Sequence, residues 1–195
     1  MSIDLLRSLV WTDYRLAVVF CVLVPIGLMV WALYKRANPI SHLLVIYWRV
    51  SSLLAISVYL LLDQNPIGFI TGWAALILIP LSLWFWVDLN EEIADRRGLL
   101  KLAVSAWRWA TTVYCAIAAL GQAPYLRCAS KAAIGATDCQ VWLEPAKIYG
   151  QMFHSDVRTG KLGFLAITAL LLYGLYFGYF VLFRMSKQGR SATGF

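Results

Sequence analysis

Charge is scarce in this sequence. Only 14% of its 195 residues are charged, whereas 61% are hydrophobic, and a soluble domain carries about 25% charged residues. The net charge of +7 comes from basic residues that are scattered over the polar segments, so it does not indicate a nucleic-acid partner. The composition excludes an ordinary soluble domain and indicates that lipid is the solvent.

Catalytic and cofactor motifs are also missing. There is no P-loop, no HExxH, no nucleophile elbow and no carboxylate pair inside an apolar run, which argues against NTPases, the usual hydrolases and proton relays. The two histidines, His42 and His154, fall on opposite sides of the predicted membrane, and no CxxCH site is present. A bis-histidine haem within one chain is thereby excluded, and no metal site is favoured. We expect no enzyme and no certain cofactor.

Long apolar runs are what the sequence does contain. Each is close to the roughly 20 residues that a helix needs to cross the hydrocarbon core. We therefore predict an all-α fold, a polytopic transmembrane helix bundle with about five spans, as a single membrane domain over residues 1–195. The spans are expected at 16–34, 43–62, 67–87, 102–120 and 162–183.

Three segments between or before these runs are too polar to cross. In Ile3–Trp11 apolar residues recur at helical spacing, which is typical of a short amphipathic helix lying in the interface. In 88–101 acids precede bases, which predicts a short surface helix. Residues 121–161 are long for a loop, and we expect either an ordered cap or a binding surface.

The distribution of lysine and arginine predicts the orientation. Five spans leave seven basic residues on the side of the N-terminus and eight on the other side. Long loops translocate largely regardless of their charge, and without the five basic residues of 121–161 the comparison is two against eight. We expect the C-terminus in the cytoplasm, and the N-terminus and 121–161 in the lumen or periplasm.

The cysteines are divided between the two environments. Cys128 and Cys139 lie in 121–161, and Cys21 and Cys115 lie inside predicted spans. On the outer side of a membrane an oxidised pair is permitted, so a Cys128–Cys139 disulfide is the favoured interpretation. Two free thiols are the alternative, and a zinc site is less favoured because no CxxC spacing is present.

Two arginines interrupt apolar runs. Arg49 and Arg108 each lie six residues after the start of a predicted span, which puts both about 9 Å below the same face. Tryptophans adjoin both arginines and acids end the third span, which suggests a shared anion pocket or an ion-pair network. The neighbours considered for this site are Trp48, Trp107, Trp109, Asp88, Glu91 and Glu92.

The ligand of such a pocket would be a lipid phosphate or sulfate, or the polar end of a quinone or of a pigment such as chlorophyll or carotenoid. The plainer interpretation is that each arginine snorkels to the interface or makes a structural pair.

Two GxxxG pairs point to close helix packing rather than to activity. They are Gly68 with Gly72 and Gly174 with Gly178. The tyrosines at 173, 176 and 179 form a stripe that fits a helix contact face better than a pigment site.

Six segments together resemble a known family. They are RSLVWTDYRLAV, YWRVSSLLAISVYL, IPLSLWFWVDLNEE, WRWATTVY, VWLEP and GYFVLFRMSKQGRSATGF. With these segments, which extend over nearly the whole chain, the protein resembles a family of cyanobacterial integral membrane proteins of unknown function. The resemblance implies a thylakoid or plasma membrane, and a role in the assembly, stabilisation or regulation of a photosynthetic or respiratory complex. It carries over no catalytic residue.

The leading hypothesis is a non-enzymatic integral-membrane accessory, assembly or scaffold protein, with a lipid or pigment near the two arginines. Its partners would be membrane lipids and other membrane protein subunits. The alternatives are a small anion transporter or channel that uses Arg49 and Arg108, and a membrane-embedded lipid or isoprenoid enzyme.

Overall fold

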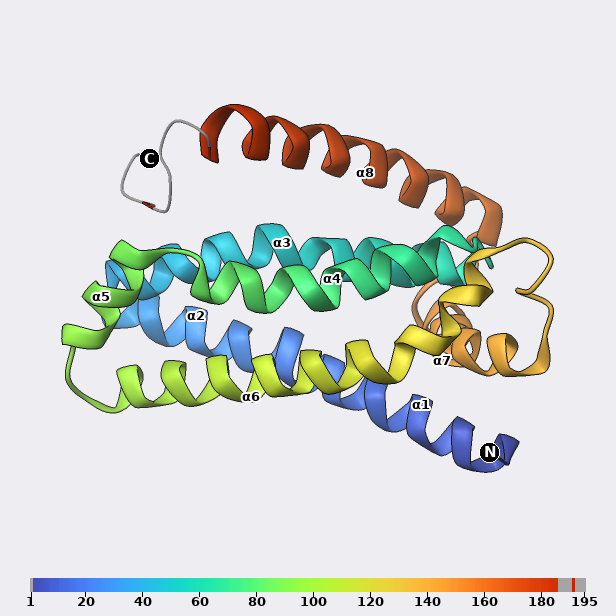
Figure 1. The fold of residues 1–195 in the computed structure, drawn as a ribbon, viewed down its shortest axis with the longest axis horizontal. Coiled ribbons are helices and arrows are strands. Elements are labelled where there is room, and N and C mark those ends of the chain that lie inside the picture. The colour runs from blue at the N-terminus through green and yellow to red at the C-terminus, as the bar shows by residue number, and fades with distance from the viewer. Residues whose placement is uncertain (1, 186–190, 192–195) are drawn as a thin grey trace.

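The structure, a computed structural model, describes residues 2–185 and residue 191. Most of the polar tail, 186–190 and 192–195, lies outside the described residues. Every regular element in the described part is a helix, so the predicted all-α bundle is confirmed. Long helices run side by side along the molecule, while α5 and α7 lie at its two ends (Figure 1).

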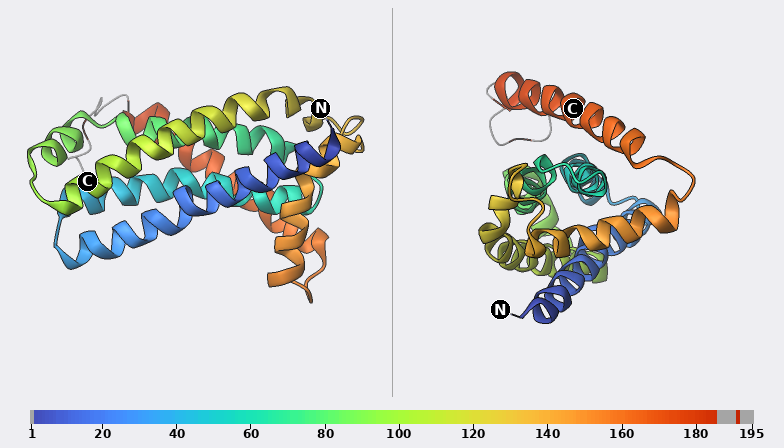
Figure 2. Two further views of the ribbon diagram at one scale, coloured as in Figure 1. Left: turned by 90° about the horizontal axis from the view of Figure 1, so that it is seen from below. Right: turned by 90° about the vertical axis from the view of Figure 1, so that its right-hand side faces the viewer.

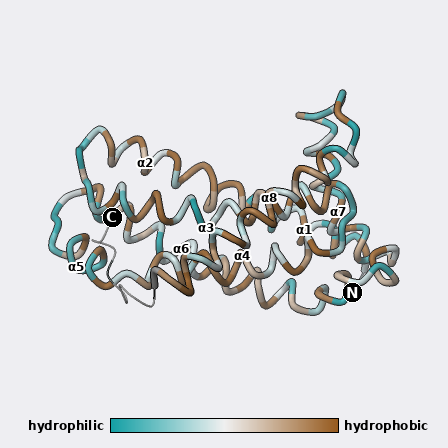
Figure 3. The backbone as a smooth tube through the Cα atoms, turned by 90° about the horizontal axis from the view of Figure 1, so that it is seen from above, coloured by the Kyte–Doolittle hydropathy of each residue, from teal (hydrophilic) through white to brown (hydrophobic). Residues whose placement is uncertain are grey.

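The helices follow one another through short connections. The elements are α1 (Ile3–Ala17), the π-helical η1 (Val18–Leu23), α2 (Val24–Tyr34), α3 (Asn38–Leu62), α4 (Ile67–Trp84), α5 (Val87–Asp95), α6 (Leu99–Gln122), the 3-10 helix η2 (Ala123–Ala129), α7 (Thr137–Phe153), α8 (Thr159–Tyr179) and the π-helical η3 (Phe180–Met185). Hydrophobic residues dominate the middle of the bundle and hydrophilic ones its two ends (Figure 3).

Four helices are long and apolar enough to cross a membrane, by length and composition. They are Ile3–Tyr34, Asn38–Leu62, Ile67–Trp84 and Thr159–Phe183. The chain thus has the make-up of an integral membrane protein. The predicted span at 102–120 is a helix of the bundle, α6, but it is not among these four, because Arg108 and its tryptophans and threonines lower its mean hydropathy.

The N-terminal segment differs from the prediction. Ile3–Trp11 is not a separate interfacial helix, because the chain stays helical without a break from Ile3 to Tyr34. The amphipathic part faces the cap with Leu6 and Val10, which are buried. Continuing a helix costs less than ending one, since every end leaves backbone groups unpaired.

Local signals explain where the other helices begin and end. Pro39 lies in the first turn of α3, where its missing N–H costs nothing. The turn between α3 and α4 uses the amide oxygen of Asn65, which accepts a hydrogen bond from the Ile67 N–H at 3.1 Å. Gly98 has a φ of 111° between α5 and α6, a conformation that side chains with a Cβ rarely adopt.

Segment 121–161 is an ordered helical cap. It contains the end of α6, then η2, α7 and the start of α8, and α7 crosses the end of the bundle (Figure 2). A second hydrophobic cluster joins the cap to the bundle through Leu6, Leu62, Phe69, Trp142 and Leu143. Of the two alternatives, the structure therefore favours an ordered cap.

The bundle holds the π-helical segment η1 by two side-chain hydrogen bonds. Tyr47 Oη on α3 donates to the Cys21 carbonyl at 2.7 Å, and Trp107 Nε1 on α6 donates to the Phe20 carbonyl at 2.8 Å. The two rings also contact each other edge to face at 5.0 Å. A π-helical turn disturbs the regular ladder, and here side chains of neighbouring helices bond its carbonyls.

Replacing Tyr47 by Phe removes this donor and keeps the ring. Because the carbonyl is buried, we expect the free energy of unfolding to fall by about 1–3 kcal/mol. Tyr34→Phe, at a side chain that is 81% exposed, is the matched control and should change nothing. Thermal unfolding in detergent, followed by far-UV circular dichroism, measures both, and equal stability of the two variants would contradict the role of Tyr47.

Candidate functional site

Arg108 is a buried residue of α6. Its side chain lies against the C-terminal end of α4. Its exposed fraction is 4%, and its Nη2 donates to the Leu83 carbonyl and to Asn90 Oδ1, both at 2.6 Å. Asn90 Nδ2 in turn donates to the Trp84 carbonyl at 3.0 Å. The last carbonyls of a helix lack intrahelical partners and carry partial negative charge. Arg108 and Asn90 together therefore cap α4.

The indole of Trp84 covers the Arg108 guanidinium. The ring centroid lies 4.0 Å from Cζ, a distance that gives cation–π attraction in a desolvated place. Trp84 Nε1 is held by Thr112 Oγ1 at 2.9 Å. With protein acceptors on one side and an indole on the other, Arg108 is enclosed and does not offer its charge to an anion from outside.

Arg49 has quite different surroundings. Its side chain on α3 is exposed, and its Nη1 donates to Tyr176 Oη on α8 at 3.1 Å. Helix α3 begins at Asn38, five residues before the predicted start, so Arg49 lies about 16 Å from the end of its helix. For Arg108, nine residues into α6, the same estimate is about 13 Å. The two arginines have separate partners and do not form one site.

The acids proposed as counter-charges lie on α5. Asp88 Oδ2 accepts from Ser191 Oγ at 3.1 Å, and its Oδ1 accepts from the Leu89 N–H. Glu91 and Glu92 are exposed. Within residues 2–185 and 191, the ion pairs involve Arg7 and Arg127 and neither Arg49 nor Arg108.

The three tryptophans that adjoin the arginines serve different contacts. Trp107 bonds η1, as described above. Trp48 packs edge to face on Tyr47 at 5.7 Å. Trp109 is 61% exposed, with its ring 4.9 Å from that of Trp84. No shared aromatic pocket around both arginines results.

The two glycine pairs differ in what surrounds them. A Cβ at Gly68 would meet the Leu61 side chain at 2.8 Å, and one at Gly72 would lie 3.7 Å from Ser57, so this pair lets α3 and α4 approach closely. At Gly174 and Gly178 nothing lies within 4 Å of where a Cβ would stand. The second pair is thus open, on a helix that lies at the outer side of the bundle (Figures 1 and 2).

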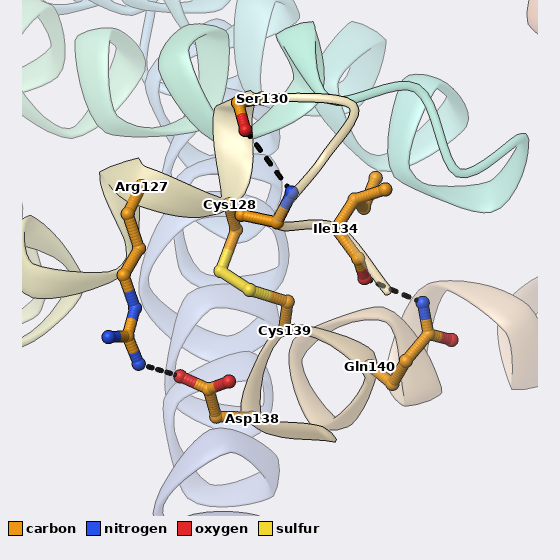
Figure 4. The surroundings of a disulfide bond; sticks show 8 residues. Arg127, Cys128, Ser130, Ile134, Asp138, Cys139 and Gln140 are labelled. Atoms are coloured by element: carbon orange, nitrogen blue, oxygen red, sulfur yellow. Dashed lines mark hydrogen bonds and ion pairs between the residues drawn. A yellow bond between two sulfur atoms is a disulfide. The ribbon is translucent and has the colours of Figure 1, made fainter. Parts of the chain in front are cut away.

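A disulfide closes the cap. Cys128 and Cys139 are bonded, with their Cα atoms 5.7 Å apart, which confirms the predicted bridge. Beside it, Arg127 pairs with Asp138, and Gln140 Nε2 donates to the Ile134 carbonyl at 2.8 Å (Figure 4). The hydrogen bond from Arg127 lowers the pKa of Asp138 below its ordinary value. This exposed ion pair contributes little stability, so the bridge is the main constraint here.

Sequence reasoning missed the polar contacts that tie α1 to the rest. Arg7 makes a two-pronged ion pair with Glu144 on α7, with Nε 3.0 Å from Oε2 and Nη2 3.1 Å from Oε1. Asp13 accepts hydrogen bonds from Tyr114 and Gln122 on α6, at 3.0 and 3.1 Å. These partners are more than a hundred residues away, and the sequence carries no signal that pairs them.

Two hollows lie outside the arginine regions. A polar cavity of about 410 Å³ opens where α3 ends and α7 and α8 meet. The side chains around it include Asp63, Gln64, Lys147, Gln151, His154 and Thr159. Next to α4, a cleft of about 470 Å³ is lined by Leu76, Pro80 and Trp84 and by the small residues Cys115, Ala116 and Ala119 of α6. Its apolar lining suits a hydrocarbon chain.

Metal chemistry gains no support from the side chains. Throughout the described part of the chain, no group of three His, Cys, Asp or Glu residues is placed to hold a metal ion.

A family model described as "Protein of unknown function (DUF3177)" matches residues 7–193. The chain belongs to this family. No curated protein and no solved structure was found to match the chain. The DUF3177 match extends over the arginines, both glycine pairs and the cap, and it assigns no activity to any of them.

The two arginines should respond differently to replacement by leucine. Arg108→Leu leaves the end of α4 uncapped, and we expect it to lower the free energy of unfolding by about 2–4 kcal/mol. Arg49→Leu loses one hydrogen bond to a neutral hydroxyl and removes a charge from the middle of an apolar helix, so it should not lower the free energy of unfolding. Thermal unfolding of both variants in detergent tests this. A large loss for Arg49 together with none for Arg108 would refute the assignment of roles.

Proposed function

We propose that this DUF3177 protein is a non-enzymatic accessory or scaffold protein of a membrane complex, and that it binds another membrane protein through α8. The observation that carries the proposal is the exposure of this helix. In its most apolar 18-residue window only 6% of the residues are buried, compared with 22% for Ile3–Tyr34, 39% for α3 and 44% for α4. Helix α8 is held near its start, where Leu162, Gly163 and Ala166 are buried, and just beyond its end, where Phe180 packs on Trp86.

The surface of α8 suits a helix rather than lipid alone. Gly174 and Gly178 form a flat strip without a neighbouring atom, flanked by the exposed side chains of Leu171, Leu175 and Leu182. Small residues let two backbones approach closely, and van der Waals contact then drives association in the membrane. Gly68 and Gly72 show this use inside the chain, where they bring α3 and α4 together.

The setting of this function is also part of the proposal. We propose a thylakoid or plasma membrane of a cyanobacterium, with a photosynthetic or respiratory complex as the partner, on the basis of the family resemblance. The C-terminus would lie in the cytoplasm, and the cap in the lumen or periplasm. The disulfide supports this orientation, because such bonds persist in oxidising compartments.

The docking role of α8 is tested by bulky substitutions at its open glycines. We expect the wild-type protein, purified in a mild detergent from native membranes, to bring a defined complex that mass spectrometry can inventory. The double variant Gly174→Ile/Gly178→Ile should lose that complex at unchanged thermal stability, because the strip no longer admits a second backbone. Gly27→Ile is the matched control, since Gly27 is also an open helical glycine. A monomer without partners in several detergents would contradict the proposal.

The orientation is tested by thiol labelling of intact cells. A cysteine introduced at the exposed cap position Lys131 (Lys131→Cys) should be labelled by a membrane-impermeant maleimide from outside the cytoplasmic membrane, without reduction. Cys21 and Cys115 are buried, and Cys128 and Cys139 are joined in a disulfide, so the wild-type protein should remain unlabelled. Labelling that appears only after cell lysis would reverse the assigned orientation or move the protein to an internal membrane. Right-side-out thylakoid and plasma membrane vesicles then distinguish these two outcomes.

A further inference from the structure

Arg49 is a charge at the middle of an apolar helix. Eleven residues separate it from Asn38 and thirteen from Leu62, at the two ends of α3. At 1.5 Å per residue these separations are about 16 and 20 Å. If the hydrocarbon core, about 30 Å thick, is centred on α3, Arg49 lies about 13 Å from the nearer boundary, farther than an arginine side chain extends, so snorkelling does not account for this residue.

An arginine in hydrocarbon is costly unless it is paired. The cost is about 2.5–3.5 kcal/mol on the lenient scale. Among residues 2–185 and 191, the guanidinium makes one hydrogen bond, to Tyr176 Oη, and no ion pair, although it has five N–H donors. Tyr176 is neutral, so the charge itself stays uncompensated. One turn earlier on α8, Tyr173 Oη is buried and also lacks a hydrogen-bond partner in the described part.

These polar atoms lie on the side of the bundle where α3 meets α8. Helix α8 supplies the two tyrosines, whereas Gly174 and Gly178 are each two residues from Tyr176 and so lie about 160° around the helix from it. A helix seated on the glycines would therefore face away from Arg49, which belongs instead to an exposed stripe of α3 together with Val45 and Ser52. A cation in such a stripe favours a partner that brings a carboxylate to the same depth.

We propose that Arg49 is the recognition point for a transmembrane helix of a different protein, which pairs an aspartate or glutamate with its guanidinium. This inference rests on the proposed function and adds to the contact at α8 a second contact, at α3, for which it names the chemistry of the partner. The planar guanidinium can bind both oxygens of a carboxylate. In a medium without water, the pair would fix both the register and the identity of the partner.

Other occupants fit this surface less well. Lipid phosphates lie at the interface and cannot reach the middle of α3. A second copy would bring another Arg49 to the same surface, and helices α3, α4, α6 and α8 contain no acidic residue. The first long helix does contain Asp13, but Tyr114 and Gln122 already occupy its carboxylate. The charge pattern therefore favours a different protein.

Synthetic transmembrane peptides test the proposal without knowledge of the natural partner. Three leucine–alanine host peptides carry Glu, Gln or Leu at the centre and a dansyl group at one end. They are mixed with the full-length protein in phosphatidylcholine liposomes at mildly alkaline pH. The nine tryptophans of the protein act as energy donors, so association appears as energy transfer.

We expect the Glu peptide to associate about tenfold more tightly than the Gln peptide, a factor that corresponds to about 1.4 kcal/mol. Arg49→Gln should abolish this preference, and Arg49→Lys should keep part of it because the charge remains without the planar fork. Arg97→Gln removes an equal charge from the exposed connector before α6 and should keep the whole preference.

Equal association of the three peptides with the wild-type protein would overturn the inference. A preference for Glu that survives Arg49→Gln would overturn it as well. In the native membrane, loss of the complex in the Gly174→Ile/Gly178→Ile variant combined with full retention in Arg49→Gln would leave the docking function standing and remove Arg49 from it. If both variants keep the complex, the docking function itself fails.

Discussion

The bundle depends on hydrogen bonds from side chains to backbone carbonyls that have no partner within their own helix. In an apolar solvent an unpaired carbonyl has no water to accept, so each one must be bonded within the protein. Trp107 and Tyr47 bond η1, and Arg108 bonds the end of α4. Trp73 Nε1 reaches the Ala119 carbonyl near the end of α6 at 3.0 Å. These bonds link α3, α4 and α6 to their neighbours at fixed positions, which apolar contacts alone would not do.

Helix α8 shows what happens where this kind of bond is missing. In the described residues its polar link to the bundle is a bond between two side chains, Arg49 and Tyr176. Its start is nevertheless fixed, because Leu162, Gly163 and Ala166 are buried. Just beyond its end, Phe180 packs on Trp86. A helix held near its two ends and exposed between them can receive a neighbour without disturbing the core. The exposure of α8 and its small number of polar bonds to the bundle therefore have the same cause.

Hydropathy alone predicted the class of fold and the approximate position of the apolar helices. The disulfide was also predictable, because two cysteines in one polar segment have few alternatives. The role of Arg108 was not predictable, since it depends on α5 folding back so that Asn90 meets the end of α4. The glycine pairs make the same point: Gly68 and Gly174 have identical motifs, but only the three-dimensional arrangement decides which one is covered.

The first long helix was misjudged for a related reason. Ile3–Trp11 has the pattern of an interfacial helix, and the following run has that of a span, so a boundary between them was expected. Hydrophobic periodicity shows which face of a helix is apolar, but it does not show whether two consecutive helical segments form one unbroken helix. The contacts of Arg7 with Glu144 and of Asp13 with Tyr114 hold the amphipathic half against the cap and α6, and no break is needed.

The π-helical turn η1 has a geometric consequence for the whole N-terminal helix. An α-helix advances about 100° per residue, so a turn with one extra residue rotates everything after it by that angle. The face of α1 that meets the cap and the face of α2 that meets α3 are therefore set in phase by η1. If Ile3–Tyr34 were α-helical throughout, Leu28 and Ala32 would be turned by about 100° from their present direction relative to Leu6 and Val10, and so away from the core in which they are buried. Segment η1 therefore fixes the rotation of α2 relative to α1, although neither helix's sequence indicates that such an adjustment is needed.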